Sequence, residues 1–125
     1  MLYLFNDDCF KKVVIMKEIR KVIYENRGQF LIINICDKNE IIYNNIPMLV
    51  DEKTLIKYLQ NLYLIINNWD EKYINTKTID NSYWKLSIIY TDGNKREYMG
   101  KSKYPNNFES FERLNLSLVD EVQNG

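Results

Sequence analysis

Apolar residues recur every three or four positions between residues 52 and 68, which predicts an amphipathic helix. Asp51 precedes this segment and can accept a hydrogen bond from the amide two or three residues later, so we expect it to be the N-cap. A pair of asparagines marks the expected end of the helix. The predicted apolar stripe consists of Leu55, Ile56, Leu59, Leu62, Tyr63, Ile66 and Trp69.

Residues 83–90 alternate between apolar and polar side chains, which predicts a strand with one buried face. Asp92 and Gly93 tolerate the positive φ of a tight turn, and residues 95–99 supply a return strand that ends at Gly100. The pattern places Trp84, Leu86, Ile88 and Tyr90 on one face, and Lys85, Ser87 and Thr91 on the other.

The length of the hairpin loop is open from the sequence. A two-residue loop places Ile88 opposite Glu97, whereas a three-residue loop at 92–94 places it opposite Tyr98. We favour the three-residue loop because it keeps a buried aliphatic side chain opposite an aromatic one.

A second amphipathic segment follows Tyr104-Pro105, and proline is favoured at or just before a helix start. We therefore expect a closing helix over residues 107–118, followed by a polar, flexible tail at 119–125. Its expected inner side carries Phe108, Phe111, Leu114 and Leu118, with Asn115 as a further candidate.

The first fifty residues admit two interpretations. Residues 29–36 predict a strand, with a turn and then a partner strand at 40–43. Residues 10–24 contain many β-branched side chains that favour strands, while their apolar spacing also fits a helix. We favour strands joined to residues 29–36 by a turn at 25–28, and the helix stays open as the alternative.

Together these patterns predict a single α+β domain over residues 1–125. An antiparallel sheet, made of an N-terminal meander and a C-terminal hairpin, packs with two helices. A chain of 125 residues can bury a core without disulfides or a structural metal. The spacing of Cys9 and Cys36 matches no zinc site, so we interpret both as reduced thiols.

The composition argues against catalysis. The chain has no histidine, which excludes Ser-His and Cys-His nucleophilic catalysis within one chain. The adjacent carboxylates Asp7-Asp8 and Asp70-Glu71 point to opposite sides of an extended backbone, so neither pair makes a shared acid-base or divalent-metal site. Phosphate-loop and dinucleotide motifs are absent. We expect a protein that is not an enzyme, with no catalytic, metal-binding or cofactor-binding residues.

Sixteen isoleucines, sixteen asparagines and no alanine are typical of coding bias in an AT-rich bacterial or phage genome. Residues 1–8 have neither the basic nor the apolar region of a signal peptide. No apolar run approaches the roughly 20 residues of a membrane span. We therefore expect a cytoplasmic protein without a membrane partner.

The net charge is zero, which disfavours a dedicated duplex-DNA binder because such proteins need a clustered basic face. The charges are unevenly distributed, however. Residues 82–104 carry a net charge of +3, and residues 105–125 carry a net charge of −3. A basic hairpin followed by an acidic helix is explained most simply by mutual compensation.

Several features of the C-terminal half form a pattern. A helix ends in Trp69, a D-x-x-x-W segment ends in Trp84 and leads into a D-G hairpin, and Gly100 is followed by a Y-P-x-x-F helix start. Over about residues 52–118 this pattern resembles a family of small uncharacterised proteins from low-GC Gram-positive bacteria and their mobile elements. The chain departs from the family at Asn81-Ser82, where a glycine is usual. The resemblance implies an α+β fold and carries no catalytic residues.

Large aromatic side chains also lie at the expected element boundaries, and each can bury about 150–250 Å². We expect them to form the seam between the hairpin and the two helices. They are Trp69, Trp84, Tyr104, Phe108 and Phe111.

Ten tyrosines exceed what one core of this size can absorb, so several are expected at the surface, where tyrosine favours interfaces. The basic hairpin interleaves tyrosines with cations, which is typical of a stacking and phosphate surface for single-stranded nucleic acid. The same pattern suits a patch presented to an acidic protein groove. The candidate partner-binding residues are Lys85, Tyr90, Lys95, Arg96, Tyr98, Lys101 and Lys103.

These observations favour a non-catalytic protein-binding module from a bacterial or phage genome, acting as a stoichiometric inhibitor that occludes a groove on its target. Anti-CRISPR proteins are of this kind, and their partners are nucleic-acid-binding effectors. A toxin-immunity protein, whose partner is a toxin, is one alternative. A single-stranded nucleic-acid-binding protein that uses the basic hairpin is another, and a homodimer joined by an apolar strand edge is a third.

Overall fold

The computed structural model describes residues 19–35, 38–77 and 82–124 of the chain. The predictions for residues 10–18, Cys9 and Cys36 lie outside these ranges. In chain order the described elements are β1 (Ile19–Asn26), β2 (Gln29–Asn34), β3 (Glu40–Tyr43), β4 (Ile46–Leu49), α2 (Glu52–Ile66), β5 (Lys72–Ile74), β6 (Tyr83–Tyr90), β7 (Lys95–Lys101) and α3 (Phe108–Asn124).

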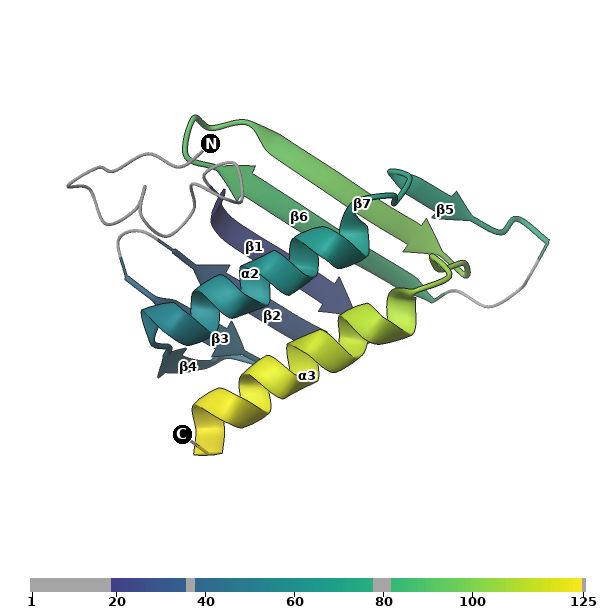
Figure 1. Cartoon of the computed structure of the whole chain (residues 1–125). Coiled ribbons are helices and arrows are strands. Elements are labelled where there is room, and N and C mark those ends of the chain that lie inside the picture. Colours follow the sequence, from purple (N-terminus) through teal and green to yellow (C-terminus); the bar gives the residue numbers. More distant parts are fainter. Residues whose placement is uncertain (1–18, 36–37, 78–81, 125) are drawn as a thin grey trace.

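The strands form one sheet with the order β4-β3-β2-β1-β6-β7-β5. Neighbouring strands are antiparallel, except that β5 runs parallel to β7. Helices α2 and α3 lie side by side on one face, and no described element covers the other face (Figure 1). The predicted α+β class is confirmed, and the pairing of β1 with β6 joins the meander to the hairpin.

Two tight turns shape the meander. Arg27 and Gly28 join β1 to β2 with φ of 47° and 85°, and Asn44 and Asn45 join β3 to β4 with φ of 48° and 73°. Positive φ at both loop residues belongs to the two-residue turns whose twist matches that of antiparallel strands. These turns fix the register of β1 against β2 and of β3 against β4.

The meander predictions are confirmed where the chain is described. Residues 29–34 and 40–43 are strands, and so is the C-terminal part of the ambiguous segment 10–24, from Ile19 onward. The turn predicted at 25–28 is shorter, because Asn26 pairs with Gln29 and stays in the ladder. Strands β4 and β5 were not predicted.

The register of the β6–β7 hairpin differs from both predicted alternatives. Ile88 lies opposite Arg96, and Leu86 lies opposite Tyr98. The Tyr90 amide donates to the Asn94 carbonyl at 2.9 Å, and the Gly93 amide donates to the Tyr90 carbonyl at 3.0 Å. The loop therefore has three residues but begins one position earlier than predicted, at Thr91, because Gly93 with φ of 90° takes the left-handed position that closes such loops.

The predicted N-cap of α2 is confirmed. The Thr54 amide donates to Asp51 Oδ1 at 2.7 Å. The buried stripe differs slightly from the predicted one, because Tyr58 is buried and Tyr63 is exposed. The helix ends at Ile66, close to the predicted stop.

Helix α3 is longer than predicted. It begins at Phe108 and continues to Asn124, so the segment expected as a flexible tail at 119–125 is helical over its described part. Val119 is buried and Val122 packs against the core, and both continue the apolar spacing that starts at Phe111. The polar composition of this segment had concealed that spacing.

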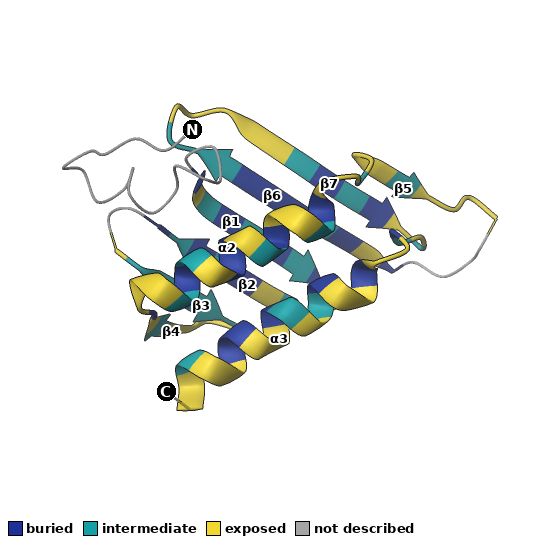
Figure 2. Ribbon diagram, viewed as in Figure 1, coloured by how far each residue is buried: buried dark blue, intermediate teal, exposed yellow. Residues whose placement is uncertain are grey.

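The predicted aromatic seam is confirmed. The Trp69 ring centroid lies 5.6 Å from that of Trp84 and 5.4 Å from that of Phe111, both edge-on. Phe108 packs against Trp84 at 4.9 Å and against Tyr104 at 4.8 Å. The dark blue residues of Figure 2 show that the core lies between the sheet and the helices.

Gly100 makes room for Trp84. Gly100 lies opposite Trp84 in the ladder, and a Cβ atom on it would lie 2.0 Å from Trp84 Nε1. The Trp84 indole N–H instead passes over the glycine and donates to the Lys103 carbonyl at 2.9 Å. A side chain at position 100 would therefore displace the central ring of the seam.

Candidate functional site

The register shows which side chains point away from the helices, and we call this surface the open face. Ile42 lies opposite Ile32, and Ile32 lies opposite Ile23, so three half-buried isoleucines form a row across β3, β2 and β1. The row continues onto Ser87 of β6 and Glu97 of β7. An apolar centre thus lies beside a charged margin on one surface.

The predicted partner-binding residues divide between the two faces of the sheet. Lys85, Lys95 and Lys101 share the open face, because they alternate with the buried residues of β6 and β7. Tyr90, Arg96 and Tyr98 lie on the side of the helices, and Lys103 follows the end of β7 with an exposed side chain. The hairpin therefore does not present its seven candidates as one surface.

Glu97 organises the cations of the open face. Its Oε2 atom lies 2.9 Å from Lys85 Nζ and 3.5 Å from Lys95 Nζ, and the Ser87 hydroxyl donates to the same oxygen at 3.3 Å. The hydrogen bond from Lys85 lowers the pKa of Glu97, and the same bond raises the pKa of Lys85. All three charged groups are solvated, so this cluster fixes positions more than it adds stability.

The candidates on the helix side form a different arrangement. The Arg96 guanidinium lies over the Tyr98 ring, 5.9 Å from its centroid. These residues and Tyr90 line a small cavity of about 90 Å³ beside the end of α2. Tyr98 is buried, and burial raises the pKa of its hydroxyl. A buried ring cannot stack on a base, so Tyr98 does not belong to a nucleic-acid surface.

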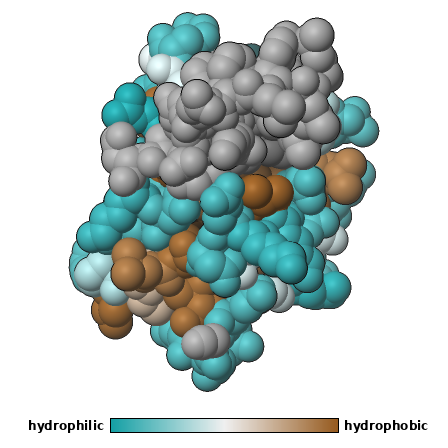
Figure 3. Space-filling model, turned by 60° about the vertical axis from the view of Figure 1, so that its left-hand side comes forward, coloured by the Kyte–Doolittle hydropathy of each residue, from teal (hydrophilic) through white to brown (hydrophobic). Residues whose placement is uncertain are grey.

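Apolar side chains are also exposed where the sheet ends at β4. Ile46 and Leu49 are 58% and 71% exposed, and Leu116 of α3 is 52% exposed. Figure 3 shows brown side chains gathered on the side of the molecule where β4 and the end of α3 lie. Pro47 lies within β4 and has no N–H, which weakens this edge as a template for another strand.

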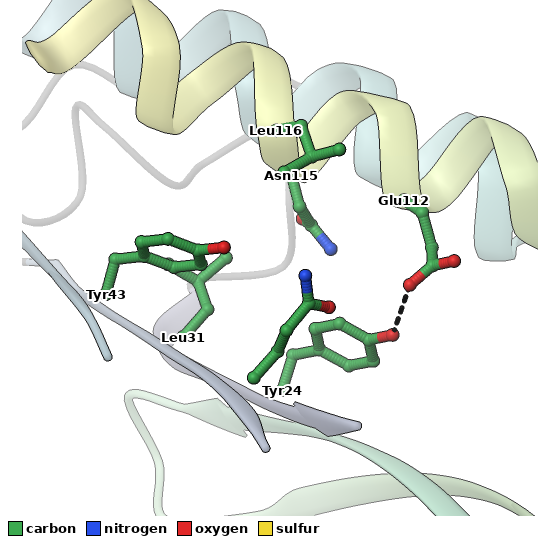
Figure 4. Close-up of a pocket in the computed structure, with 7 residues that line it drawn as sticks. Tyr24, Leu31, Tyr43, Glu112, Asn115 and Leu116 are labelled. Carbon is green, nitrogen blue, oxygen red and sulfur yellow. Dashed lines mark hydrogen bonds between the residues drawn. The ribbon is translucent and has the colours of Figure 1, made fainter. Parts of the chain in front are cut away.

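Sequence reasoning missed a cavity of about 120 Å³ between α3 and strands β1 to β3. Tyr24, Glu112 and Asn115 point into it (Figure 4), and the Tyr24 hydroxyl donates to Glu112 Oε2 at 3.0 Å. The Tyr58 hydroxyl donates to Asn115 Oδ1 at 2.6 Å. The available signal was Asn115, a polar residue that falls on the inner side of an apolar stripe.

Neither region has the composition of a metal site. Within the described ranges no group of three or more Asp, Glu, Cys or His side chains could hold a metal ion. Of the helices in those ranges, none combines the length and the apolar character needed to cross a membrane.

Comparison with known proteins finds no match among family models, curated proteins or solved structures. The resemblance noted over residues 52–118 therefore stays a prediction.

Proposed function

We propose that the chain is a non-catalytic protein-binding module that docks through its open face onto a partner with an apolar surface and an acidic border. The observation that carries the proposal is the row formed by Ile23, Ile32 and Ile42 on a face that no described element covers. Burial of apolar surface is worth about 25 cal/mol per Å², so an occupant of this row gains binding free energy. Contiguous apolar surface of this kind marks interaction sites.

The charges of the open face indicate the chemistry of the partner. The register places Lys21 opposite Ile89, Lys85 opposite Glu25, and Lys101 opposite Tyr83, all on the same side as the isoleucine row. Lys72 and Lys95 belong to this side too. Because the cations outnumber the acids there, an acidic partner is steered toward the face and oriented on it.

A sheet face with an apolar centre would bind its target by covering a surface of it. The chain would then be a stoichiometric inhibitor from a bacterial or phage genome that occludes a groove on an effector. An anti-CRISPR-like role against a nucleic-acid-binding effector is the narrower hypothesis, and immunity to a toxin is its alternative. Both require one-to-one binding without turnover.

The test is quantitative binding to a purified target. A target captured by the chain from host extract is purified, and its Kd is measured calorimetrically at two salt concentrations. We expect Ile32→Asp to weaken binding at least tenfold, because it places a charge in the middle of the apolar row. The control Leu64→Asp changes an equally apolar, exposed residue on α2 and should leave the Kd unchanged.

Equal Kd values for the wild type and Ile32→Asp would refute docking through the open face. A Kd that does not change with salt concentration would contradict an acidic border on the partner. Binding with a target-to-chain ratio far from one would contradict occlusion by a stoichiometric inhibitor.

A second candidate function is supported by two exposed rings on the open face. Phe30 is 36% exposed and Tyr83 is 42% exposed. Glu25 lies opposite Phe30 on one neighbouring strand and opposite Lys85 on the other, so these three residues form one row across the sheet. Rings beside lysines suit the bases and phosphates of single-stranded nucleic acid. Fluorescence polarisation with a labelled oligonucleotide tests this function, and salt-sensitive binding lost on Lys85→Gln would favour it.

A further inference from the structure

The cavity between α3 and the meander has polar walls that the fold leaves incompletely paired. Its walls come from β1, β2 and β3 on one side and from α3 on the other, with Leu31 and Tyr43 on the sheet side. It encloses about 120 Å³, on the order of the 150 Å³ cavity that accommodates one benzene ring in an engineered protein. The space is therefore several times the volume of one water molecule and approaches the volume that a small ring needs.

Asn115 supplies an unused hydrogen-bond donor. The residue is only 6% exposed, and its Oδ1 atom is occupied by the Tyr58 hydroxyl. Its Nδ2 atom has no partner among the described residues and is aimed into the cavity (Figure 4). A buried donor without a partner is costly, and such groups in native proteins call for an explanation.

Glu112 supplies an acceptor on the same side of the helix. It precedes Asn115 by three residues, so the two side chains are neighbours on one face of α3. The Tyr24 hydroxyl donates to Glu112 Oε2 and accepts from Asn26 Nδ2, both at 3.0 Å. Burial raises the pKa of Tyr24, which keeps its hydroxyl protonated as a donor and so fixes the carboxylate in place.

The cavity opens toward a larger groove. Glu112 and Gln29 line both spaces, and the groove encloses about 590 Å³ between the β1–β2 turn and the start of α3. Tyr104 and Phe108 form an aromatic wall of this groove. Asn26 also lines it, and the Asn26 Oδ1 atom is buried without a partner among the described residues. A ligand could thus enter through the groove and place one ring in the cavity.

We propose that this cavity binds a planar heterocycle that carries a hydrogen-bond acceptor next to an N–H donor, as nucleobases do. The acceptor pairs with Asn115 Nδ2, and the N–H donor pairs with the Glu112 carboxylate. The ring lies between Leu31, Tyr43 and Tyr24, and any substituent extends along the groove toward Phe108. This site lies on the helix side of the sheet and is separate from the open face.

The test is calorimetric titration of the full chain with cytosine and, as a matched probe, with unsubstituted pyrimidine. Cytosine carries the acceptor and the donor, whereas pyrimidine has ring acceptors and no N–H. We expect saturable binding of cytosine and at least tenfold weaker binding of pyrimidine. Backbone amide shifts in NMR spectra should place cytosine against α3 around Asn115.

Two isosteric variants test the polar groups. Asn115→Asp keeps the acceptor for Tyr58 and removes the free donor, and Glu112→Gln removes the charged acceptor. Each should weaken cytosine binding about tenfold. Asn61→Asp on α2 and Glu121→Gln on the exposed side of α3 are the matched controls, because neither residue lines the cavity, and both should bind cytosine as the wild type does.

A third variant keeps the proposal testable if Asn115→Asp fails to fold. Leu116→Trp places a large ring at the exposed rim of the cavity and should block cytosine without disturbing the core. Two results would overturn the proposal. One is the absence of saturable cytosine binding at millimolar concentration, in which case ordered water satisfies Asn115. The other is cytosine binding that Asn115→Asp, Glu112→Gln and Leu116→Trp all leave unchanged.

Discussion

The same strands place isoleucines on both faces of the sheet, but the described helices cover only one of them. On the helix side Val22, Ile33 and Ile41 are completely buried and join a single core. On the open face their neighbours in sequence Ile23, Ile32 and Ile42 are only half-buried, and lysines of β1, β6 and β7 lie on the same face. The difference shows that each strand divides its apolar residues between a core on one face and an uncovered surface on the other, and the uncovered surface is the one that we propose binds a partner.

The largest expected loss of stability comes from a substitution at the centre of the core, on the helix side of the sheet. Trp84→Ala removes the ring that joins the hairpin to Trp69, just after α2, and to Phe108 of α3, and should lower the free energy of unfolding by about 3–5 kcal/mol. That is a large part of the stability of a small domain. Urea unfolding followed by far-UV circular dichroism measures it, and an unchanged midpoint would contradict the core assignment.

A matched pair on β2 compares the two faces directly. Ile33→Ala opens a hole in the core and should cost about 2–5 kcal/mol, whereas Ile32→Ala on the open face should cost about 1 kcal/mol or less. The affinity for the partner should fall more in Ile32→Ala than in Ile33→Ala. Equal losses of stability in the two variants would mean that the open face is covered like the core.

The pH dependence should separate the faces again. Burial raises the pKa of Tyr58 above its ordinary value of 10.0, so its neutral form stabilises the fold below pH 10 and this contribution is lost as pH rises further. Tyr58→Phe should flatten the alkaline decline of the urea midpoint, while itself costing about 1–3 kcal/mol because Asn115 Oδ1 loses its donor. If the urea midpoint of Tyr58→Phe falls at alkaline pH as steeply as that of the wild type, Tyr58 is not the source of the decline.

The smallest expected effect on stability comes from a substitution on the open face. Lys85 holds the pKa of Glu97 below its ordinary value of 4.5, so the stabilisation from this contact is present above that pH and is lost on acidification. Glu97→Gln should reduce the acid decline of the melting temperature slightly and leave the midpoint at pH 7 almost unchanged. A large loss of stability at pH 7 would show that the Glu97 cluster supports the fold and not only the surface.

The local pattern of apolar and polar residues was sufficient to predict much of the fold. The spacing of apolar residues located α2, and the alternation along residues 83–90 assigned the buried face of β6 correctly. It also placed Lys85 and Tyr90 on opposite faces, which already argued against a single patch on the hairpin. These features depend on neighbours in sequence, and periodicity reports on them directly.

The remaining features depend on contacts between distant segments. The pairing of β1 with β6 determines which side chains share the open face, and alternation within a strand does not specify its neighbour. The hairpin register was misplaced because Gly93 and not Asn94 ends the loop. The cavity requires Tyr24, Leu31 and Asn115 to meet across three elements, and only Asn115 gave a local signal.

The aromatic seam also gives the protein a built-in optical reporter. Trp69 and Trp84 are the two tryptophans of the chain, and both belong to one cluster with Phe108 and Tyr104. Those two rings line the groove that leads to the cavity, whereas the isoleucine row lies on the opposite face of the sheet. Intrinsic fluorescence should therefore respond to a small ligand that enters the groove and stay nearly constant when a partner covers the open face, so one unlabelled sample can tell the two binding events apart.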